Sequence, residues 1–465
     1  MVEEEKRHES DSMGEVAIPE WAYWGAQTQR AVENFGVSKN RITPSMIRAL
    51  GLIKKSAARA NGELGTVEEK LVAAIVDAAG EVIDGEWDDH FPIDVFQTGS
   101  GTSWNMNANE VIANRANQML GSPLGTRSPV HPNDHVNRGQ SSNDVIPTAV
   151  HVANRMSLVH LLDALAVLRT SLEGKAREFA DAVKLGRTHL QDAVPMTLGQ
   201  EFSGFADQIR KGIRRVENTL PHLEELALGG TAVGTGINCH PDFPDLAIGF
   251  LAEETGLPFR PAENRFEAIA TRDAQVELMG TLNVIATSLM KIANDLRLLA
   301  SGPRGALGEI VLPTLQPGSS IMPGKVNPVI PEMVIQVAAY VMGKAVSVTT
   351  AGQNAPLELN MMHPLIAMET EESISVLANT CRVFAERCID GVEADTERMG
   401  FWLEWSLALV TPLANRIGYD QAAKLAYRAY KEKRTIREVV FEADVLPAED
   451  VEKILDPRSM LQSGK

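Results

Sequence analysis

The middle of the chain contains five long stretches in which apolar residues recur at helical spacing. They cover residues 147–184, 200–226, 268–300, 331–351 and 365–390. In the first stretch, Val152, Met156 and Leu162 fall on this spacing, with charged residues between them. A helix of about 30 residues is about 45 Å long, which is too long for loops of the same chain to cover. The stretches therefore predict a mainly α protein built on a bundle of long helices.

Residues 279–299, within the third stretch, are apolar on more than one side of the expected helix. A helix that is apolar most of the way round is buried. Because one chain cannot enclose all five helices, we expect the bundle to pack against copies of itself and to form a homo-oligomer.

The composition limits the partners that the chain can have. Of its 465 residues, 44% are hydrophobic and 23% charged, as in soluble globular proteins. A formal net charge of -17 opposes binding to nucleic acid or to an anionic membrane, so any positive charge that binds an anion must be local. The cysteines Cys239, Cys381 and Cys388 lack the spacing of a disulfide framework or a zinc site. We expect them to be small buried side chains in a reducing cytoplasm.

The two ends of the chain carry no targeting signal. The N-terminal segment MVEEEKRHESDS is charged and lacks the apolar region of a secretion signal, so we expect a solvated tail and a cytoplasmic protein. No uncharged apolar run reaches about 18 residues, and the C-terminal SMLQSGK carries no lipidation or retention signal. Strand signals are weak, and the best ones lie near residues 13–18 and 436–441.

Five polar segments interrupt the helical patterns and share a composition of Gly, Ser, Thr, Asn and Asp. They cover residues 96–110, 131–144, 184–195, 228–238 and 318–328. Functional groups are commonly carried on loops that a rigid scaffold positions. These segments offer hydroxyls, amides, cations and imidazoles, which suit the binding of carboxylates. The groups are Ser100, Thr102, Ser141, Ser142, Thr188, Ser319, Ser320, Asn107, Asn133, Asn143, Asn327, Lys325, Arg187, His131 and His189.

The segment GSSIMPGKVNP at residues 318–328 has the composition of a phosphate-binding loop but not its spacing. A phosphate loop needs four residues between its first glycine and the Gly-Lys pair, and then a Ser or Thr. Here five residues separate Gly318 from Gly324, and Val326 follows Lys325. The segment therefore does not predict a nucleotide site.

Two prolines that follow, Pro328 and Pro331, suit the start of a helix, and Glu332 would lie in its first turn. A helix N-terminus directly behind Lys325 would favour a negatively charged ligand. Glu332 could equally be a solvated first-turn acid, and His189 a structural histidine bonded to backbone. The residues alone leave both alternatives open.

The nearest candidate for a metal site is His131, Asp134 and His135, because imidazoles four residues apart share one face of a helix. Pro132 and Asn133 favour a turn instead. The residues therefore predict no metal site.

Several motifs, taken together, resemble those of one family, the class II fumarases, in the superfamily that also contains aspartase, argininosuccinate lyase and adenylosuccinate lyase. The resemblance covers nearly the whole chain and keeps the order of the motifs. The motifs are MGEVAIPEWAYWGAQTQRAVENF, FPIDVFQTGSGTS, HPNDHVN, QSSND, GRTHLQDAVPMTLGQEF, GGTAVGTGIN and GSSIMPGKVNP, the last being the signature loop of the superfamily.

The same motifs separate elimination of water from elimination of ammonia. Fumarase-like members tend to carry QTGSGTS, SSND, GRTHLQD and MPGK, where aspartase-like members tend to carry QGGAGTS, STND, GRTQLQD and MPAK. This chain has the first form at all four places. The following VNPVIPEMV is somewhat aspartase-like, so aspartate ammonia-lyase on the same scaffold remains the alternative.

The resemblance implies a three-domain fumarase/aspartase-type subunit that assembles into a tetramer with a twenty-helix core. The expected domains are residues 1–139, a central long-helix bundle at 140–396, and a small domain at 397–465. Each active site would draw on three subunits. The implied reaction is the reversible anti addition of water to fumarate, which gives (S)-malate in the tricarboxylic acid cycle, with no metal or organic cofactor.

Residue roles follow from the same resemblance. Ser319 would remove the C3 proton as an alkoxide, and His189, paired with Glu332, would handle water on the opposite face. Lys325 and Asn327 would stabilise the charge that develops on the substrate carboxylate. The implied substrate-binding residues are Ser100, Gly101, Thr102, Ser141, Ser142, Asn143, Thr188, Ser320, Lys325, Val326 and Asn327, and the implied second dicarboxylate site is His131, Pro132, Asn133 and Asp134.

The chain departs from the family pattern at three places. Trp104 stands where relatives usually have a small or polar residue, which would reshape the edge of the pocket. Ser128 replaces the cation expected three positions before His131, with Arg127 one place earlier, and this puts the second site in doubt. The segment NMMHP is less aromatic than the family's version.

Overall fold

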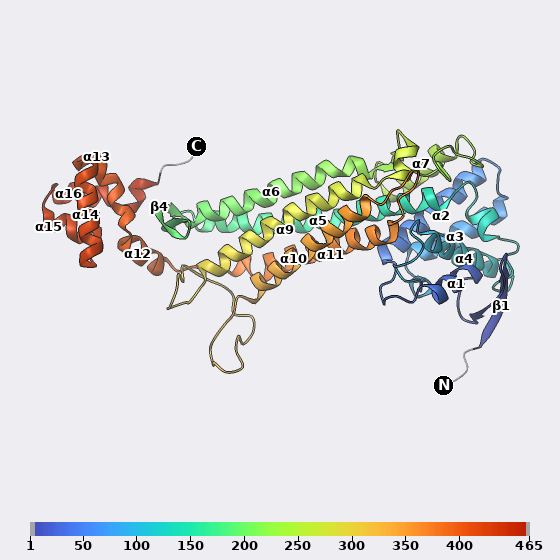
Figure 1. Ribbon diagram of the computed structural model, residues 1–465, viewed down its shortest axis with the longest axis horizontal. Coiled ribbons are helices and arrows are strands. Elements are labelled where there is room, and N and C mark those ends of the chain that lie inside the picture. The colour runs from blue at the N-terminus through green and yellow to red at the C-terminus, as the bar shows by residue number, and fades with distance from the viewer. Residues whose placement is uncertain (1–4, 462–465) are drawn as a thin grey trace. The chain divides into compact units, whose positions relative to one another are not determined.

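Figure 1 shows the computed structural model, which describes residues 5–461. The chain divides into two compact units, each made of three chain segments. Unit 1 contains the residues up to Leu162, Arg214–Val284 and Tyr340–Leu377, and unit 2 contains Asp163–Ile213, Ile285–Ala339 and the residues from Ala378 onward.

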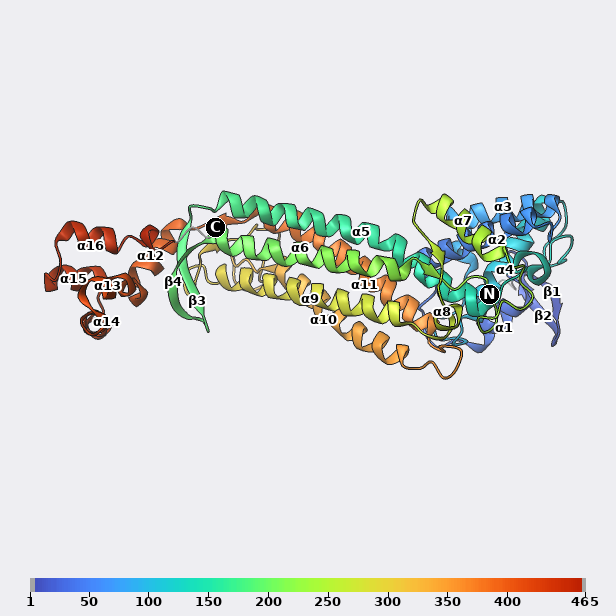
Figure 2. The same cartoon turned by 90° about the horizontal axis from the view of Figure 1, so that it is seen from above.

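Five long helices dominate the fold, and each contributes residues to both units (Figures 1 and 2). They are α5 (Ser142–Glu178), α6 (Leu198–Leu223), α9 (Asp273–Leu299), α10 (Val329–Gly352) and α11 (His363–Arg387). They match the five stretches of helical spacing, so the prediction of a mainly α protein with long helices is confirmed. The first helix ends before the predicted residue 184, because a strand begins at Val183.

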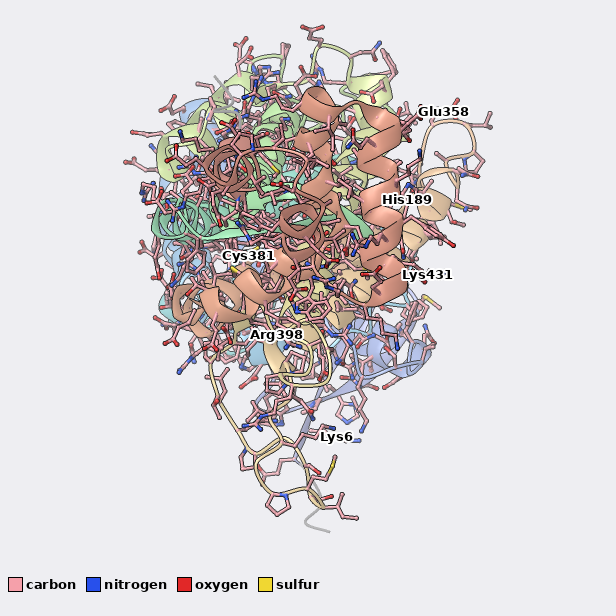
Figure 3. All side chains as sticks on the ribbon, turned by 90° about the vertical axis from the view of Figure 1, so that its left-hand side faces the viewer. Lys6, His189, Glu358, Cys381, Arg398 and Lys431 are labelled. Atoms are coloured by element: carbon pink, nitrogen blue, oxygen red, sulfur yellow. The ribbon has the colours of Figure 1, made fainter. Side chains whose placement is uncertain are left out.

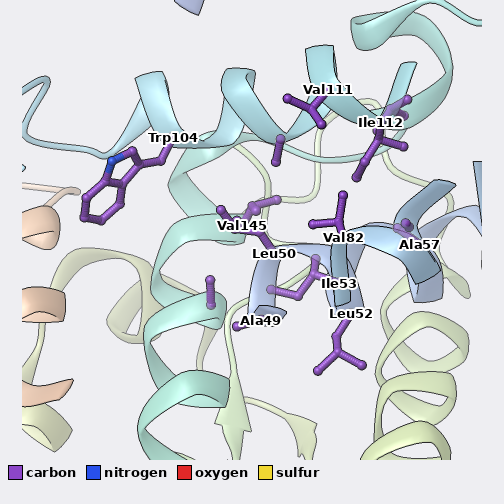
Figure 4. Packing of buried hydrophobic residues seen from close by; sticks show 14 of the residues in the cluster. Ala49, Leu50, Leu52, Ile53, Ala57, Val82, Trp104, Val111, Ile112 and Val145 are labelled. Atoms are coloured by element: carbon purple, nitrogen blue, oxygen red, sulfur yellow. The ribbon is translucent and has the colours of Figure 1, made fainter. Parts of the chain in front are cut away.

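Unit 1 also holds the shorter N-terminal helices, which pack around one hydrophobic core. Its remaining elements are β1 (Lys6–Asp11), β2 (Gly14–Pro19), α1 (Ala26–Asn34), α2 (Pro44–Glu63), α3 (Glu69–Ile83), η1 (Asp88–His90), α4 (Thr102–Met119), η2 (Pro132–Val136), β5 (Glu225–Leu226), α7 (Phe243–Thr255), β6 (Arg260–Pro261) and α8 (Arg265–Ala270). The hydroxyl of Thr43 caps α2 by accepting from the amide of Met46. Figure 4 shows buried Leu50 of α2 packed near Val82 of α3 and Val145 of α5.

Unit 2 carries two short sheets and the C-terminal helices. Its remaining elements are β3 (Val183–Thr188), β4 (Gln191–Thr197), β7 (Ile310–Val311), η3 (Ile389–Gly391), β8 (Glu393–Ala394), α12 (Thr396–Trp405), η4 (Leu407–Leu413), α13 (Ala414–Ile417), α14 (Tyr419–Glu432), α15 (Ile436–Ala443), α16 (Ala448–Ile454) and η5 (Pro457–Met460). Phe179 of α5 meets Phe202 of α6 edge-on, with ring centroids 5.4 Å apart. A second core joins the C-terminal helices through buried Leu413, Ala429 and Val440.

Each sheet has two strands. β1 pairs with β2, β3 with β4 and β7 with β8, all antiparallel, whereas β5 and β6 pair in parallel. Each sheet therefore joins two short segments of the chain, and the helices supply most of the hydrophobic core.

Helices α9 and α10 leave apolar side chains exposed in the single chain. Val284 and Leu298 of α9 are each 40% exposed, and Tyr340 and Val346 of α10 are 47% and 68% exposed. By length and composition alone these two helices would also be apolar enough to cross a membrane, as the buried helices of globular proteins often are. Each of the two helices thus exposes apolar side chains that a further protein chain can cover.

The N-terminal segment is not the solvated tail that its charge predicts. Its first four residues lie outside the described part of the chain, but Lys6–Asp11 form β1. The guanidinium of Arg7 donates to the carbonyls of Ala22 and Trp24 and pairs with buried Glu9. The charges of this segment predicted a solvated tail, but in the structure Arg7 and Glu9 pair with each other and Arg7 bonds to backbone carbonyls.

The predicted strand at 436–441 is wrong, because this segment is the helix α15. Thr435 and Glu438 form a capping box, in which each side chain accepts from the backbone amide of the other residue. Ile436 and Val439 are buried three residues apart. The β-branched residues suggested a strand, but their spacing is helical. The other predicted strand, near residues 13–18, is confirmed as β2.

Candidate active site

The signature segment 318–328 forms a loop whose two ends are bonded together. The amide of Gly318 donates to the carbonyl of Lys325 over 2.8 Å, and Nδ2 of Asn327 donates to the carbonyl of Gly318 over 2.6 Å. A Cβ at Gly318 would lie 2.5 Å from the carbonyl oxygen of Lys325, so a larger residue does not fit there. These bonds fix Asn327 at the base of the loop.

Ser319, one residue into the loop, turns its hydroxyl oxygen toward backbone amides. The amides of Ile321 and Met322 donate to Oγ of Ser319 over 3.2 Å and 2.9 Å. Donors that bond to the charged form of a group favour that form. The local backbone therefore favours negative charge on Ser319, whose side chain is partly exposed.

A cavity of about 700 Å³ opens beside this loop. Lys325, Val326, Asn327 and Glu332 line it together with Arg297 of α9, whereas Ser319 and Ser320 do not. Helix α10 begins directly after the loop, so the positive end of its dipole lies beside the cavity. No acidic side chain in the described part of the chain pairs with Lys325. The cavity thus offers an unpaired cation and a helix N-terminus, which suit a carboxylate.

The segment GRTHLQD, predicted as part of a loop at 184–195, is instead a β-hairpin. Thr188 of β3 lies opposite Gln191 of β4, so His189 and Leu190 form a two-residue turn. Both turn residues have positive φ, 56° and 58°, as a type I′ turn requires. His189, labelled in Figure 3, is exposed at this tip. The sequence hid the hairpin because the turn lacks the Asn-Gly pair that usually marks one.

Buried charges hold the base of the hairpin. Fully buried Glu309 accepts from Nη1 of Arg187 over 3.0 Å and lies 3.4 Å from Nζ of Lys184. Lys184 also donates to Glu201 over 2.9 Å. Removing one partner of a buried ion pair costs about 3–5 kcal/mol, because the other charge is left uncompensated. The base is therefore firmly held although the tip is exposed.

The His189 ring makes no hydrogen bond with any other residue that the structure describes. The alternative of a structural histidine bonded to backbone thus has no support in the single chain. Glu332 lies partly buried in the first turn of α10 and does not bond to His189 within one chain. Their pairing stays a prediction.

In unit 1, three of the predicted binding residues lie at the start of α4. Oγ of Ser100 and Oγ1 of Thr102 are 2.9 Å apart. Gly101 between them has φ of 72°, and a Cβ there would lie 2.8 Å from Cγ2 of Ile146 on α5. Positive φ and lack of space together require glycine, which lets two hydroxyls meet at a helix N-terminus.

A second group, Ser141–Asn143, lies at the start of α5 and is held by Asp144. Fully buried Asp144 accepts from the amide of Ser141 through Oδ1 and from the amides of Gly229 and Thr231 through Oδ2, each over 2.9 Å. Burial raises the pKa of Asp144 to about 6. Asp144 therefore ties the start of α5 to the glycine-rich loop before α7.

The predicted second dicarboxylate site lies on η2, a single turn of π-helix. The amides of Asn133 and Asp134 both donate to Nδ1 of His131 over 3.2 Å, and the amide of His131 donates to Nδ1 of His135 over 2.8 Å. Among residues 5–461, no three His, Cys, Asp or Glu side chains are grouped to hold a metal ion. Both imidazoles thus stabilise the turn, and ligand binding here stays a prediction.

Two residues near the site are buried in unit 1. Trp104 is 1% exposed in the core (Figure 4), and its effect on the edge of the pocket stays a prediction. Asn107, expected on a loop, is buried in α4 and donates to the carbonyl of His90. The polar segment 96–110 is a loop only as far as Gly101, because its asparagines continue into α4.

Sequence reasoning missed the buried charges that support these groups, Glu309 and Lys54. Lys54 falls on the same helical face as Leu50, Ile53 and Ala57, all buried. A lysine is almost never fully buried without partners. The charge of Lys54 at a core position of a helix was therefore the signal that could have identified this residue.

Two family models match this chain. One, described as "Lyase", matches residues 14–343, and the other, described as "Fumarase C C-terminus", matches residues 409–462. The chain is 53% identical to "Fumarate hydratase class II" of Halobacterium salinarum, over 99% of this chain and 98% of the relative. It is 50% identical to the protein of the same description from Methylorubrum extorquens, over 98% and 97%. Among solved structures, the recombinant class II fumarase from Schistosoma mansoni superposes with a TM-score of 0.95 at 41% identity, over 98% of this chain and 99% of that one.

Proposed function

Because this chain belongs to the class II fumarase family, we propose that it catalyses the reversible hydration of fumarate to (S)-malate. The observation that carries the proposal is its similarity, over nearly its whole length, to fumarate hydratases. The cavity beside α10 supports it, because unpaired Lys325 and a helix N-terminus suit a dicarboxylate.

From malate, the reaction breaks a C3–H bond and a C2–O bond. We propose that Ser319 takes the C3 proton as an alkoxide, which the amides of Ile321 and Met322 stabilise. The electron pair of the C–H bond moves into the adjacent carboxylate, which then carries nearly two negative charges. Lys325 and Asn327 oppose that charge, and such preorganised donors commonly supply the largest catalytic effect.

The leaving hydroxyl needs a proton on the opposite face of the substrate. We propose that His189, oriented by Glu332, supplies it, so that the C2 hydroxyl departs as water. An imidazole suits this step because histidine is the side chain that most often transfers protons in enzymes. The exposed position of His189 supports the proposal, since its ring nitrogens are free to meet a substrate.

We also propose a homotetramer in which each site draws on three subunits. The exposed apolar side chains of α9 and α10 support assembly, and so does the exposed tip of the β3–β4 hairpin. The second dicarboxylate site at His131, Pro132, Asn133 and Asp134 and a cytoplasmic location rest on the sequence alone.

An ultraviolet assay of fumarate formation tests the function. The purified chain should form fumarate from malate but not from aspartate, and Ser319→Ala should remove the signal. Fumarate from aspartate alone would favour the ammonia-lyase that the segment VNPVIPEMV resembles. Turnover of neither substrate would indicate a protein that has kept the fold without the activity.

A further inference from the structure

Lys54 is fully buried in the middle of α2. Its Nζ donates to three side-chain oxygens, Oδ1 of Asn105 over 2.7 Å, Oδ1 of Asn137 over 3.0 Å and Oε1 of Gln140 over 3.0 Å. An ammonium has three donors and no acceptor, so these bonds use all of them. Burial lowers the pKa of Lys54 to about 7, and the Asp144 carboxylate opposes the shift. Because burying a charge is costly, packing alone does not explain this lysine.

Asn105 connects Lys54 to the start of α5. Because the Lys54 ammonium can only donate, Asn105 turns its Oδ1 toward Lys54, and its Nδ2 faces Ser142 and Asn137. Nδ2 donates to Oγ of Ser142 over 3.0 Å and to Oδ1 of Asn137 over 3.2 Å. The Ser142 oxygen is thereby an acceptor within the protein, and its hydrogen is free to donate to a ligand.

We propose that Lys54 is a positioning residue that acts through Asn105 to hold the Ser142 hydroxyl as a hydrogen-bond donor to a substrate carboxylate. The inference rests on the proposed function, which makes Ser142 a dicarboxylate-binding residue. Without Lys54, which also holds Oδ1 of Asn137, the amides of Asn105 and Asn137 can turn over together, and Asn105 then presents Oδ1 to Ser142. The hydroxyl then donates to Asn105 and offers the substrate only lone pairs, which repel a carboxylate.

A purely structural role for Lys54 makes a different prediction. Its bonds to Asn137 and Gln140 also hold the segment between η2 and α5. Loss of that support would weaken binding whatever residue stands at position 142. Loss of the orienting effect matters only while Ser142 carries a hydroxyl.

Asn105→Asp is the sharpest variant. The new carboxylate keeps the shape and pairs with Lys54, and this ion pair offsets the lost bond to Oδ1 of Asn137, but the donor that faces Ser142 becomes an acceptor. We expect kcat/KM for fumarate to fall about ten- to a hundredfold, the effect of losing a hydrogen bond to a charged group. The fall should lie mainly in KM, and the thermal unfolding temperature should not fall. Ser142→Ala should cause a similar loss, and the two changes combined should cause little more than either alone.

Lys54→Met should reproduce the loss, again with little further effect when Ser142→Ala is already present. Lys55→Met is the matched control, because the adjacent Lys55 forms a surface pair with Glu254 over 2.7 Å and no other ion pair with a residue that the structure describes. Its kcat/KM should equal that of the wild type. The proposal would be overturned if Asn105→Asp kept the wild-type kcat/KM. It would also be overturned if the fall in kcat/KM of the combined variant equalled the product of the falls in Asn105→Asp and Ser142→Ala.

Two features of the design keep the outcomes distinct. Turnover of fumarate by the wild type is measured first, and its absence would overturn the proposed function and this inference together. Turnover with independent effects of Asn105→Asp and Ser142→Ala would overturn this inference alone. If Lys54→Met does not fold, the double-mutant cycle of Asn105→Asp and Ser142→Ala still tests whether Asn105 acts through the Ser142 hydroxyl.

Discussion

The two groups of candidate site residues are held in opposite ways. In unit 1, Ser142 accepts from Asn105, and the start of α5 is tied down by buried Asp144. In unit 2, His189 and Lys325 are exposed, and neither side chain has a partner among the described residues. The first group is held by other residues of its own chain, whereas the second has side chains free to bind outside it.

The difference lies in the side chains rather than in the backbone. The hairpin that carries His189 is fixed at its base by Glu309, and the loop that carries Lys325 is closed by Gly318 and Asn327. A site must be supported by rigid surroundings if its groups are to be placed accurately. The proposed site is shared between subunits. A segment that contributes to it needs an anchored backbone and side chains that are free to reach the site.

The largest expected effect is that of Ser319→Ala. Loss of a general base lowers turnover by about 10²–10⁴-fold. Among residues 5–461, the hydroxyl bonds only to amides of its own loop, so we expect the thermal unfolding temperature to stay at the wild-type value. Steady-state kinetics and calorimetry on the same preparation test both points. Retained turnover would place the base elsewhere, and loss of the fold would show that Ser319 supports the chain.

Mixing two variants tests whether the groups meet across subunits. His189→Asn and the double variant Ser141→Ala/Ser142→Ala should each be strongly impaired, His189→Asn by about a hundredfold or more. After the two are dissociated and reassembled together, some sites would combine unaltered groups from different chains, and activity should exceed the sum of the separate variants. Each variant reassembled with itself is the control. No gain on mixing would indicate that one chain supplies both groups.

Glu309→Gln tests the anchoring of the hairpin. The change leaves Arg187 and Lys184 without their shared buried carboxylate, so the free energy of unfolding should fall by about 3–5 kcal/mol. Glu201→Gln is the matched control, since Glu201 is partly exposed and, in the described part of the chain, pairs only with Lys184. Its effect should be smaller. Denaturant titration measures both. If the two variants lowered the free energy of unfolding equally, burial of Glu309 would not strengthen its ion pairs.

The sequence predicted the elements whose pattern is periodic and missed those that depend on distant partners. The five long helices follow from apolar spacing alone. Strand β1 was missed because its charged residues predicted a solvated segment. In the structure, Arg7 donates to the carbonyls of Ala22 and Trp24, which follow β2 in the chain. The β3–β4 hairpin was hidden because its positive-φ turn uses His189 and Leu190 instead of glycine.

The motifs identified the candidate site residues, but they did not reveal what holds them. That Lys54 orients toward Asn105, or that Glu309 lies between two cations, follows only from the fold. The predicted pairing of His189 with Glu332 does not occur within one chain. Residue roles can thus be carried over from motifs, whereas hydrogen-bond partners need coordinates.

The smallest expected effect concerns Asp144, which anchors the group in unit 1, and it depends on pH. Burial raises the pKa of Asp144 from its ordinary 3.8 to about 6, so the folded chain binds this proton more tightly than the unfolded chain. The resulting stabilisation is present below about pH 4 and is lost as the pH rises through 6. At about 1.4 kcal/mol for each pH unit of the shift, it amounts to about 3 kcal/mol.

Asp144→Asn should remove this component, because an amide resembles the protonated acid and does not titrate. The free energy of unfolding of the wild type should therefore decline from pH 4 to 6 relative to that of the variant, as measured by denaturant titration at a series of pH values. Asp245→Asn, at an exposed position on α7, should keep the wild-type profile. Parallel profiles for the wild type and Asp144→Asn would mean that the three amide donors offset the burial of the carboxylate, and that the anchor of the unit 1 group is ionised throughout this range.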